Sequence, residues 1–395
     1  MAVAGLLALH CAGPVAPQVR PGIDVLLADS LHLVRGRRVG IVTNQTGIDH
    51  AGRDDLSRLL GAGVRVTAIF SPEHGFRGTV DVENIGHGVD SATGLPVYSL
   101  YGATRAPSPE MLAQVDVLLV DLQDIGTRTY TYVSTALLAL RAATAAGVAT
   151  VVLDRPNPLG GTQVQGPVLD TALASFIGML AVPLRHGMTL GELVRLGNQS
   201  LAIRGPLTVV PVAGWRRDVW FDATALPWVR PSPNMPDLES ATHYPGIVIF
   251  EATNLSVGRG TPVAFQVVGA PWLDAAGVAG DLATVPGVAV TDTLVTPTDP
   301  TDAKYGGVTV PAVRFRVTDR GPYDPVALAV RLFAAIQTRH PAALEVDTLG
   351  LDRRLGSASL RRALLRGLPL DSLLPSWEPD LERFHALRAR YLLYH

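Results

Sequence analysis

The sequence predicts an α/β fold with a mostly parallel sheet, because short apolar strands alternate with helical stretches from residue 37 onward. Residues 115–121 and 148–153 are almost continuously apolar, as expected of strands buried on both faces. Between them, residues 130–146 are rich in Ala and Leu and stop at Gly147, a pattern typical of a helix and its end. A strand, a helix and a second strand in this order favour a right-handed crossover and therefore a parallel sheet.

The other elements of this part of the chain continue the alternation. Thr189 and Glu192 have the spacing of a capping box, so we expect a helix from there to about residue 198. A further helix is predicted at residues 54–60, and further strands at residues 39–43, 64–70, 96–100, 207–212 and 247–250.

A chain of 395 residues is long enough for two domains. Beyond about residue 262 the sequence pattern changes, and it predicts short strands with Pro and Gly turns, followed by a helix at residues 325–339. We therefore place a domain boundary near residue 260. The prediction is a larger sheet domain at residues 22–260 and a smaller α/β domain at residues 261–395.

The composition excludes several classes of protein. The hydrophobic residues make up 47% of the chain and the charged residues 17%, so we expect a sizeable core. With a net charge of −2 and no basic cluster, nucleic acid and anionic membrane surfaces are poor partners. Cys11 is the only cysteine, which excludes an intramolecular disulfide and a multi-cysteine metal site. No apolar run reaches the roughly 18 residues that a membrane span needs.

The N-terminus has some features of an export signal. Residues 2–9 resemble the apolar core of a secretory signal, and residues 14–21 look like a flexible joint, although no basic residue precedes the apolar run. We expect residues 1–21 to be a leader or a disordered N-terminus. This favours a secreted or periplasmic protein and leaves a cytoplasmic one open.

Polar residues follow the carboxyl ends of several predicted strands. In open α/β sheets those ends meet at one edge, which is where ligands bind. We therefore expect an active-site crevice there, with a second example of the pattern after residues 247–250. The candidate residues at these strand ends are Asn44, Gln45, Asp121, Gln123, Asp124, Arg155, Asn157, Glu251 and Asn254.

The segment after the strand at residues 64–70 is the most informative one. Ser71 and Pro72 stop the strand, because proline cannot extend a sheet ladder, and Glu73, His74 and Arg77 follow within five residues. Glu73 is a candidate general acid. The alternative is a surface turn with a capping Glu.

Two other interpretations of these carboxylates stay open. Asp121 or Asp124 could be the second carboxylate of a glycosidase pair, or they could serve a helix cap and an ion pair with Arg128. His74 could bind a metal with Asp121, Asp124 or His186, which would indicate a metallohydrolase. Since the sequence has no closely spaced ligand pair and lacks G-x-G-x-x-G, P-loop, G-x-S-x-G and H-E-x-x-H motifs, we expect neither a metal nor another cofactor.

Seven segments resemble those of the NamZ-like exo-β-N-acetylmuramidases, and the resemblance runs from about residue 37 to residue 275. The most specific is Phe-Ser-Pro-Glu-His-Gly-Phe-Arg-Gly at residues 70–78. The others lie at residues 94–102, 154–161, 166–170, 185–189, 231–236 and 258–261.

The resemblance implies a Rossmann-like domain, a smaller C-terminal domain and an active-site cleft between them. It also implies release of N-acetylmuramic acid from the non-reducing end of peptidoglycan fragments, with Glu73 as the catalytic acid. We expect His74, Asp121 and Asp124 to position that acid or to activate water, and an arginine to bind the lactyl carboxylate of the sugar. The alternative from another class is a non-catalytic protein that binds cell-wall sugars. The remaining candidate binding residues are Arg77, Arg128, Tyr130, Arg185, His186, Asn234 and Arg259.

Overall fold

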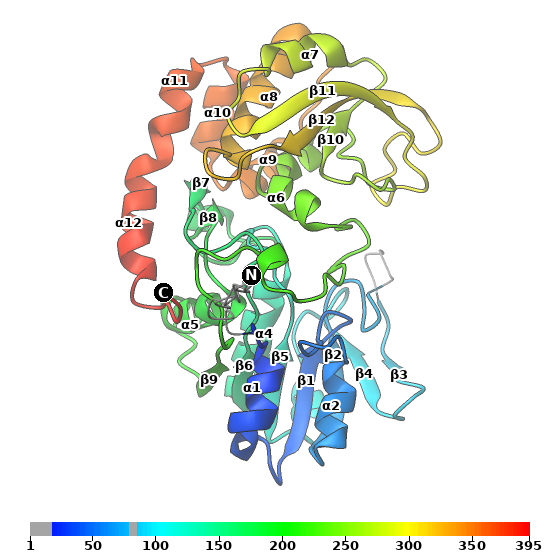
Figure 1. The fold of residues 1–395 in the computed structure, drawn as a ribbon, viewed down its shortest axis with the longest axis vertical. Helices are drawn as coiled ribbons and strands as arrows, with labels where there is room; N and C mark the ends of the chain where they lie inside the picture. Colours follow the sequence, from blue (N-terminus) through cyan, green and yellow to red (C-terminus); the bar gives the residue numbers. More distant parts are fainter. Residues whose placement is uncertain (1–17, 79–84) are drawn as a thin grey trace, which may run out of the picture.

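The computed structural model describes residues 18–78 and 85–395. A seven-stranded sheet in the order β3-β4-β2-β1-β5-β6-β9 forms the centre of the first domain (Figure 1). Every neighbouring pair is parallel except β3 and β4, which are antiparallel. The strands are β1 (Arg38–Thr43), β2 (Arg65–Ser71), β3 (Gly88–Val89), β4 (Pro96–Ser99), β5 (Val117–Asp121), β6 (Ala149–Leu153) and β9 (Leu207–Val210). The predicted α/β fold with a mostly parallel sheet is therefore confirmed.

The sheet is buried on both faces because apolar residues point alternately to either side of each strand. Ile41 and Leu119 pack in one core cluster with side chains of α1 and α2, while Val42 and Leu118 pack in the other with side chains of α4 and α5. This explains why the strands read as continuous apolar runs. The helices are α1 (Gly22–Asp29), α2 (Asp55–Gly61), α3 (Pro109–Leu112), α4 (Tyr132–Ala145) and α5 (Leu190–Ser200).

The predicted capping box opens α5. The Thr189 hydroxyl accepts the backbone N–H of Glu192 at 3.3 Å, and the Glu192 carboxylate accepts the backbone N–H of Thr189 at 3.0 Å. A small two-stranded sheet of β7 (Gln165–Val168) and β8 (Pro183–Arg185) lies between β6 and α5 in the chain. The sequence did not predict it, because its strands are too short to show a period.

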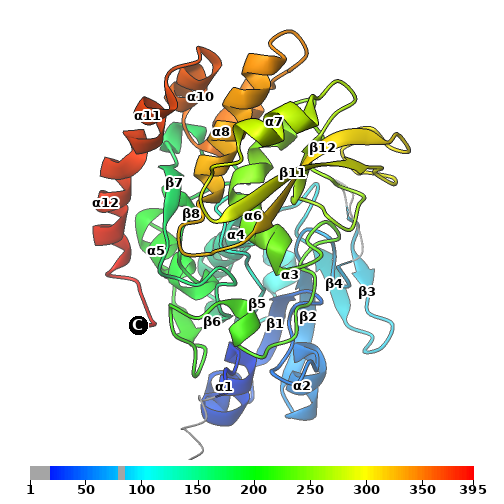
Figure 2. The ribbon, with the colours of Figure 1, turned by 45° about the horizontal axis from the view of Figure 1, so that its top comes forward.

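The second domain is the smaller α/β unit that the sequence predicts. Its three-stranded antiparallel sheet has the order β10-β12-β11, and α6 packs against α8 beneath that sheet (Figures 1 and 2). The elements are α6 (Leu238–Ile247), the 3₁₀ helix η4 (Val248–Ala252), β10 (Val267–Gly269), α7 (Ala275–Asp281), β11 (Val288–Val295), β12 (Val310–Val317), α8 (Pro325–Arg339), α9 (Thr348–Leu355), α10 (Ala358–Leu365), α11 (Leu370–Leu373) and α12 (Glu378–Arg388). The predicted boundary near residue 260 lies beyond α6 and η4 in the chain, and its position stays a prediction.

The strand predicted at residues 247–250 is wrong. These residues form the end of α6 and the start of η4, and each is at most 1% exposed. A short apolar run that is buried on all sides has no period, so it does not distinguish a strand from a helical turn.

The predicted leader lies almost wholly outside the described residues, and α1 begins at Gly22. Within residues 18–78 and 85–395, no helix is both long and apolar enough to cross a bilayer.

The C-terminal end of the chain returns to the first domain. α12 packs against β7 and runs alongside both domains in Figures 1 and 2. The Tyr394 hydroxyl then donates a 2.6 Å hydrogen bond to Asp154, whose carboxylate is fully buried at the end of β6. The backbone N–H of Val212 donates to the same hydroxyl at 2.9 Å. The last residues therefore hold the second domain to the first.

Replacing Tyr394 with Phe is expected to lower the free energy of unfolding by about 1–3 kcal/mol, because the buried Asp154 carboxylate loses a donor. Denaturant unfolding measures this change. Tyr391→Phe is the matched control, since Tyr391 is half-buried and its backbone carbonyl accepts a hydrogen bond from Arg195 that the substitution keeps. Equal stability of the two variants would contradict the prediction.

Candidate active site

A cavity of about 220 Å³ lies where the two domains meet. It brings together five of the predicted site residues, which come from segments far apart in the chain. Its lining includes Glu73, His74 and Tyr130 from the first domain and Glu251, Arg259 and Arg354 from the second.

Glu73 reaches the cavity because β2 ends at Ser71. Pro72 follows, and the backbone N–H of Gly75 donates back to the Pro72 carbonyl at 3.1 Å, which closes a tight turn. His74 takes a φ of 69° in this turn, a left-handed conformation that is strained for a residue with a side chain. Strain of this kind persists where the surrounding structure fixes a functional loop, so the turn is built to hold Glu73 and His74 in place.

The side chain of Glu73 is oriented by the start of α4. The Thr131 hydroxyl donates to the Glu73 carboxylate, with an oxygen-to-oxygen distance of 2.5 Å. Glu73 is half-buried, whereas His74 is only 8% exposed. The acid therefore stays reachable from the cavity, while its imidazole neighbour is enclosed.

Aromatic side chains line the enclosed part of the cavity. The rings of Tyr130 and Tyr244 meet edge-to-face with centroids 6.0 Å apart, and Tyr244 meets Phe265 in the same way at 4.6 Å. Each of the three is at most 8% exposed. Burial raises the pKa of Tyr130 and of Tyr244, so both phenols stay protonated at neutral pH. Three buried aromatic rings thus wall the enclosed part.

The opposite side of the cavity carries a cluster of charged side chains. The Glu251 carboxylate accepts from Arg259, whose Nη2 is 2.5 Å away, and from Arg354, whose Nη2 is 3.2 Å away. Burial acts to raise the pKa of Glu251, but the two guanidinium groups hold it below its usual value. Guanidinium groups bind carboxylates in a bidentate manner, so Arg259 and Arg354 are candidate ligands for a carboxylate on a substrate.

Arg354 is the charged residue of the cavity lining that the sequence did not predict. It lies in α9, within an Arg-rich and Leu-rich stretch that has no motif. Only the fold brings this residue next to Glu251, more than 100 positions away in the chain.

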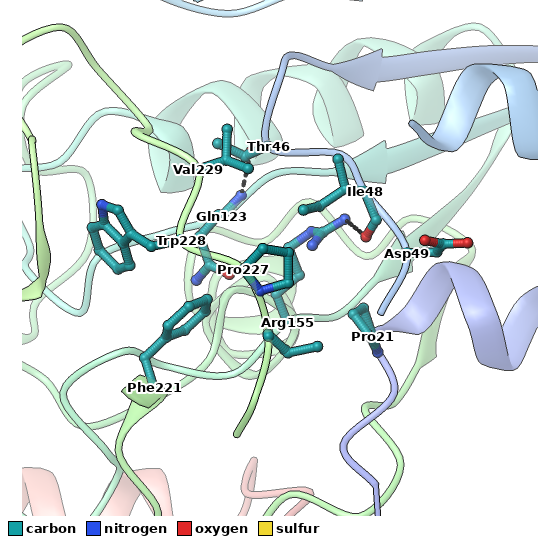
Figure 3. A pocket seen from close by; sticks show the side chains of 11 residues that line it. Pro21, Thr46, Ile48, Asp49, Gln123, Arg155, Phe221, Pro227, Trp228 and Val229 are labelled. Carbon is teal, nitrogen blue, oxygen red and sulfur yellow. Dashed lines mark hydrogen bonds between the residues drawn. The ribbon is translucent and has the colours of Figure 1, made fainter. Parts of the chain in front are cut away.

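The rest of the predicted crevice is filled by the chain itself. Figure 3 shows Phe221, Pro227 and Trp228 covering the sheet edge beside Arg155 and Gln123, where about 10 Å³ of space remains. Beneath them, the Asp121 carboxylate is fully buried and lies 2.5 Å from the guanidinium of Arg155.

Asp124 is also part of this buried framework. Its carboxylate accepts the backbone N–H of Gly126 at 2.7 Å and lies 3.6 Å from the imidazole of His186. Neither Asp121 nor Asp124 belongs to the lining of the cavity that contains Glu73. Their catalytic roles stay predictions, but this placement favours a structural role.

Most of the other predicted binding residues hold the backbone. Arg128 is the clearest case, because it is 3% exposed and donates to the carbonyls of Pro167, Val182 and Arg354. Burial lowers the pKa of Arg128 to about 9. Eight others also form hydrogen bonds with main-chain groups, as donors or as acceptors, namely Asn44, Gln45, Gln123, Asn157, Arg185, His186, Asn234 and Asn254.

Arg77 lies away from the cavity. Its exposed guanidinium forms a 2.5 Å ion pair with Asp90, and it is not among the residues that line the cavity. Of the arginines that the sequence proposed as carboxylate ligands, the structure therefore brings only Arg259 to the same cavity as Glu73.

One group of residues in the described parts of the chain has the geometry to hold a metal ion, namely Asp24, Asp49 and His50. It is not part of the cavity. The Asp49 carboxylate accepts from Arg53 and forms an ion pair with Arg58, and the Asp24 carboxylate pairs with the His50 imidazole at 2.9 Å. These contacts leave the carboxylates little capacity for an ion.

A carboxylic acid that is positioned at a cavity between two domains suits proton transfer to a glycosidic oxygen, so the site indicates a glycoside hydrolase. The family models for the N-terminal and C-terminal parts of exo-β-N-acetylmuramidase NamZ match residues 39–239 and 242–394. The chain therefore belongs to the NamZ family, and the resemblance seen in the sequence is confirmed.

Individual relatives agree with this assignment. The chain is 39% identical over 383 residues to "Peptidoglycan beta-N-acetylmuramidase NamZ" of Bacillus subtilis, covering 96% of this chain and 92% of that protein. A crystal structure of a DUF1343 family protein (BF0371) from Bacteroides fragilis matches with a TM-score of 0.88 and 32% identity, covering 97% of this chain and 100% of that one. A second one from the same organism (BF0379) has a TM-score of 0.77 and 30% identity, covering 96% and 99%.

Proposed function

We propose that this chain is an exo-β-N-acetylmuramidase that removes N-acetylmuramic acid from the non-reducing end of peptidoglycan fragments. The observation that carries the proposal is the position of Glu73, which Thr131 holds at a cavity that also contains the Arg259 and Arg354 guanidinium groups. Glu73 protonates the leaving glycosidic oxygen. The arginine pair binds the lactyl carboxylate that distinguishes N-acetylmuramic acid from N-acetylglucosamine. Action outside the cytoplasm stays a prediction.

The size of the cavity supports an exo mode of action. At about 220 Å³ it is smaller than the roughly 300–1,000 Å³ of typical ligand pockets, so it suits a single terminal sugar better than a long internal segment. The buried aromatic rings close one side, which leaves the remainder of the saccharide to extend outward.

The direct test is release of the chromophore from an aryl N-acetylmuraminide and from the matching N-acetylglucosaminide, both assayed with the full chain. We expect turnover of the muraminide to exceed turnover of the glucosaminide clearly. Calorimetric binding of a muramyl saccharide without turnover would indicate a sugar-binding protein instead. Loss of activity on chelation, with recovery on adding a metal, would indicate a metallohydrolase.

Lys304, the only lysine in the chain, helps to hold the arginine pair. Its ammonium group donates to the carbonyls of Glu251 at 3.2 Å and of Leu255 at 3.0 Å. Glu251 lies in the last turn of η4, where carbonyl groups lack partners within the helix and a cation is favourable. We infer that Lys304 fixes the backbone whose side chain binds Arg259 and Arg354.

Replacing Lys304 with Met is expected to raise KM for the aryl muraminide by about three- to tenfold, since loss of these hydrogen bonds loosens the arginine pair. The value of kcat is expected to stay within about twofold, because Glu73 is untouched. Steady-state kinetics separate the two quantities. Lys304→Arg keeps a donor and should retain most of the affinity. A loss confined to kcat would contradict this role.

A further inference from the structure

The open side of the cavity is built differently from its enclosed side. Tyr130, Tyr244 and Phe265 are buried, whereas Tyr101 and Ile177 are half-buried, as are the charged lining residues Glu73, Glu251, Arg259 and Arg354. Tyr101 follows β4 and Ile177 precedes β8, so two separate loops contribute to the open side, and we call this part of it the mouth. A saccharide whose terminal sugar fills the enclosed side can extend past these loops.

Phe176, next to Ile177 in the chain, extends this mouth beyond the cavity. Its ring lies 6.2 Å from the ring of Tyr101, at an interplanar angle of 41°. The guanidinium carbon of Arg105 lies 4.4 Å from the centroid of the same Phe176 ring. Tyr101, Phe176 and Arg105, which we call the mouth platform, thus form a continuous contact of two aromatic rings and one cation.

The mouth platform is accessible. Tyr101 and Phe176 are half-buried, and Arg105 is exposed. Within residues 18–78 and 85–395 no carboxylate forms an ion pair with Arg105, whose guanidinium group lies against the Phe176 ring. A guanidinium that lies over a ring keeps its N–H groups at the edge of its plane, where they can still bind a carboxylate in a bidentate manner. An aromatic pair with such a cation suits a ligand that has both an apolar face and a negative charge.

We propose that the mouth platform is the binding site for the leaving-group part of the saccharide, and this inference rests on the proposed function. Once the terminal sugar occupies the enclosed side and Glu73 protonates its glycosidic oxygen, the next sugar lies at the mouth. Its apolar ring face packs on Phe176 and Tyr101. In a chain that alternates the two sugars, the third sugar from the non-reducing end again carries a lactyl carboxylate. Arg105 binds this carboxylate.

The experiment compares three substrates that share the terminal N-acetylmuramic acid and differ in the leaving group. They are N-acetylmuraminyl fluoride, the N-acetylmuramyl–N-acetylglucosamine disaccharide and the corresponding tetrasaccharide. Phe176→Ala is expected to lower kcat/KM for the disaccharide by about five- to tenfold and to leave the fluoride within about twofold. Arg105→Ala is expected to lower kcat/KM by about three- to fivefold for the tetrasaccharide alone.

Two further variants make the outcome decisive. Phe176→Trp keeps an aromatic face and should retain activity on the disaccharide, while Arg35→Ala, at an exposed arginine before β1, should change none of the three rates. Equal losses on the fluoride and the disaccharide, or no loss on any substrate, would overturn the platform while leaving the proposed function intact. If the unmodified chain cleaved none of the three substrates, both the proposed function and the mouth platform would be overturned.

Discussion

Replacing Glu73 with Gln is expected to lower kcat on the N-acetylmuraminide of a weakly acidic phenol by about 10²- to 10⁴-fold, the range that a positioned general acid contributes. The amide keeps the shape of the side chain and can still bond to the Thr131 hydroxyl, which contacts Glu73 at 2.5 Å. It cannot give a proton to the leaving oxygen. The value of KM is therefore expected to change much less than kcat.

The control for Glu73→Gln is Glu382→Gln, at an exposed position in α12. This variant should be as active as the unmodified chain. Steady-state kinetics with both variants give the comparison. If Glu73→Gln kept more than about a tenth of the activity on the muraminide of a weakly acidic phenol, Glu73 would not be the proton donor.

Replacing Arg259 with Ala is expected to lower kcat/KM for the muraminide by about 10- to 100-fold, because a charge-assisted contact to the lactyl carboxylate is lost. The loss should be much smaller for the glucosaminide, which has no such group. Selectivity between the two substrates therefore falls. Removal of Arg259 also leaves Glu251 with Arg354 as its remaining guanidinium partner, which weakens the anion site further.

Arg77→Ala is the matched control for Arg259→Ala. Arg77 is exposed and paired with Asp90, and it is not part of the cavity lining. We expect its substitution to change selectivity by less than about twofold, as for most surface positions. The reverse result, with selectivity lost in Arg77→Ala and kept in Arg259→Ala, would contradict the assignment of the lactyl group to the arginine pair.

The sequence predicted the parts of the fold that have a strong local pattern. The helix predicted at residues 325–339 has the same bounds as α8, and the strand predicted at residues 39–43 differs from β1 by one residue. Both segments have either a clear periodicity of apolar residues or clear signals at their ends. The run at residues 247–250 has neither, and there the prediction failed.

The site was predictable only as far as single segments show it. Glu73 and His74 were found because a proline break follows a strong strand, a signal contained within a few residues. Arg354 was not found, because its proximity to Glu251 depends on how the second domain packs. The closure of the sheet edge by Phe221, Pro227 and Trp228 was also missed, since that irregular Pro-rich segment has no periodic pattern.

The central claim is that Glu73 protonates the leaving oxygen, and the dependence of the rate on the leaving group tests it most directly. A 2,4-dinitrophenyl muraminide needs little protonation to depart, whereas a less acidic phenol depends on it. For Glu73→Gln we predict kcat/KM within about tenfold of the unmodified chain on the first substrate and a loss of about 10²-fold or more on the second. Equal losses on both substrates would contradict the account.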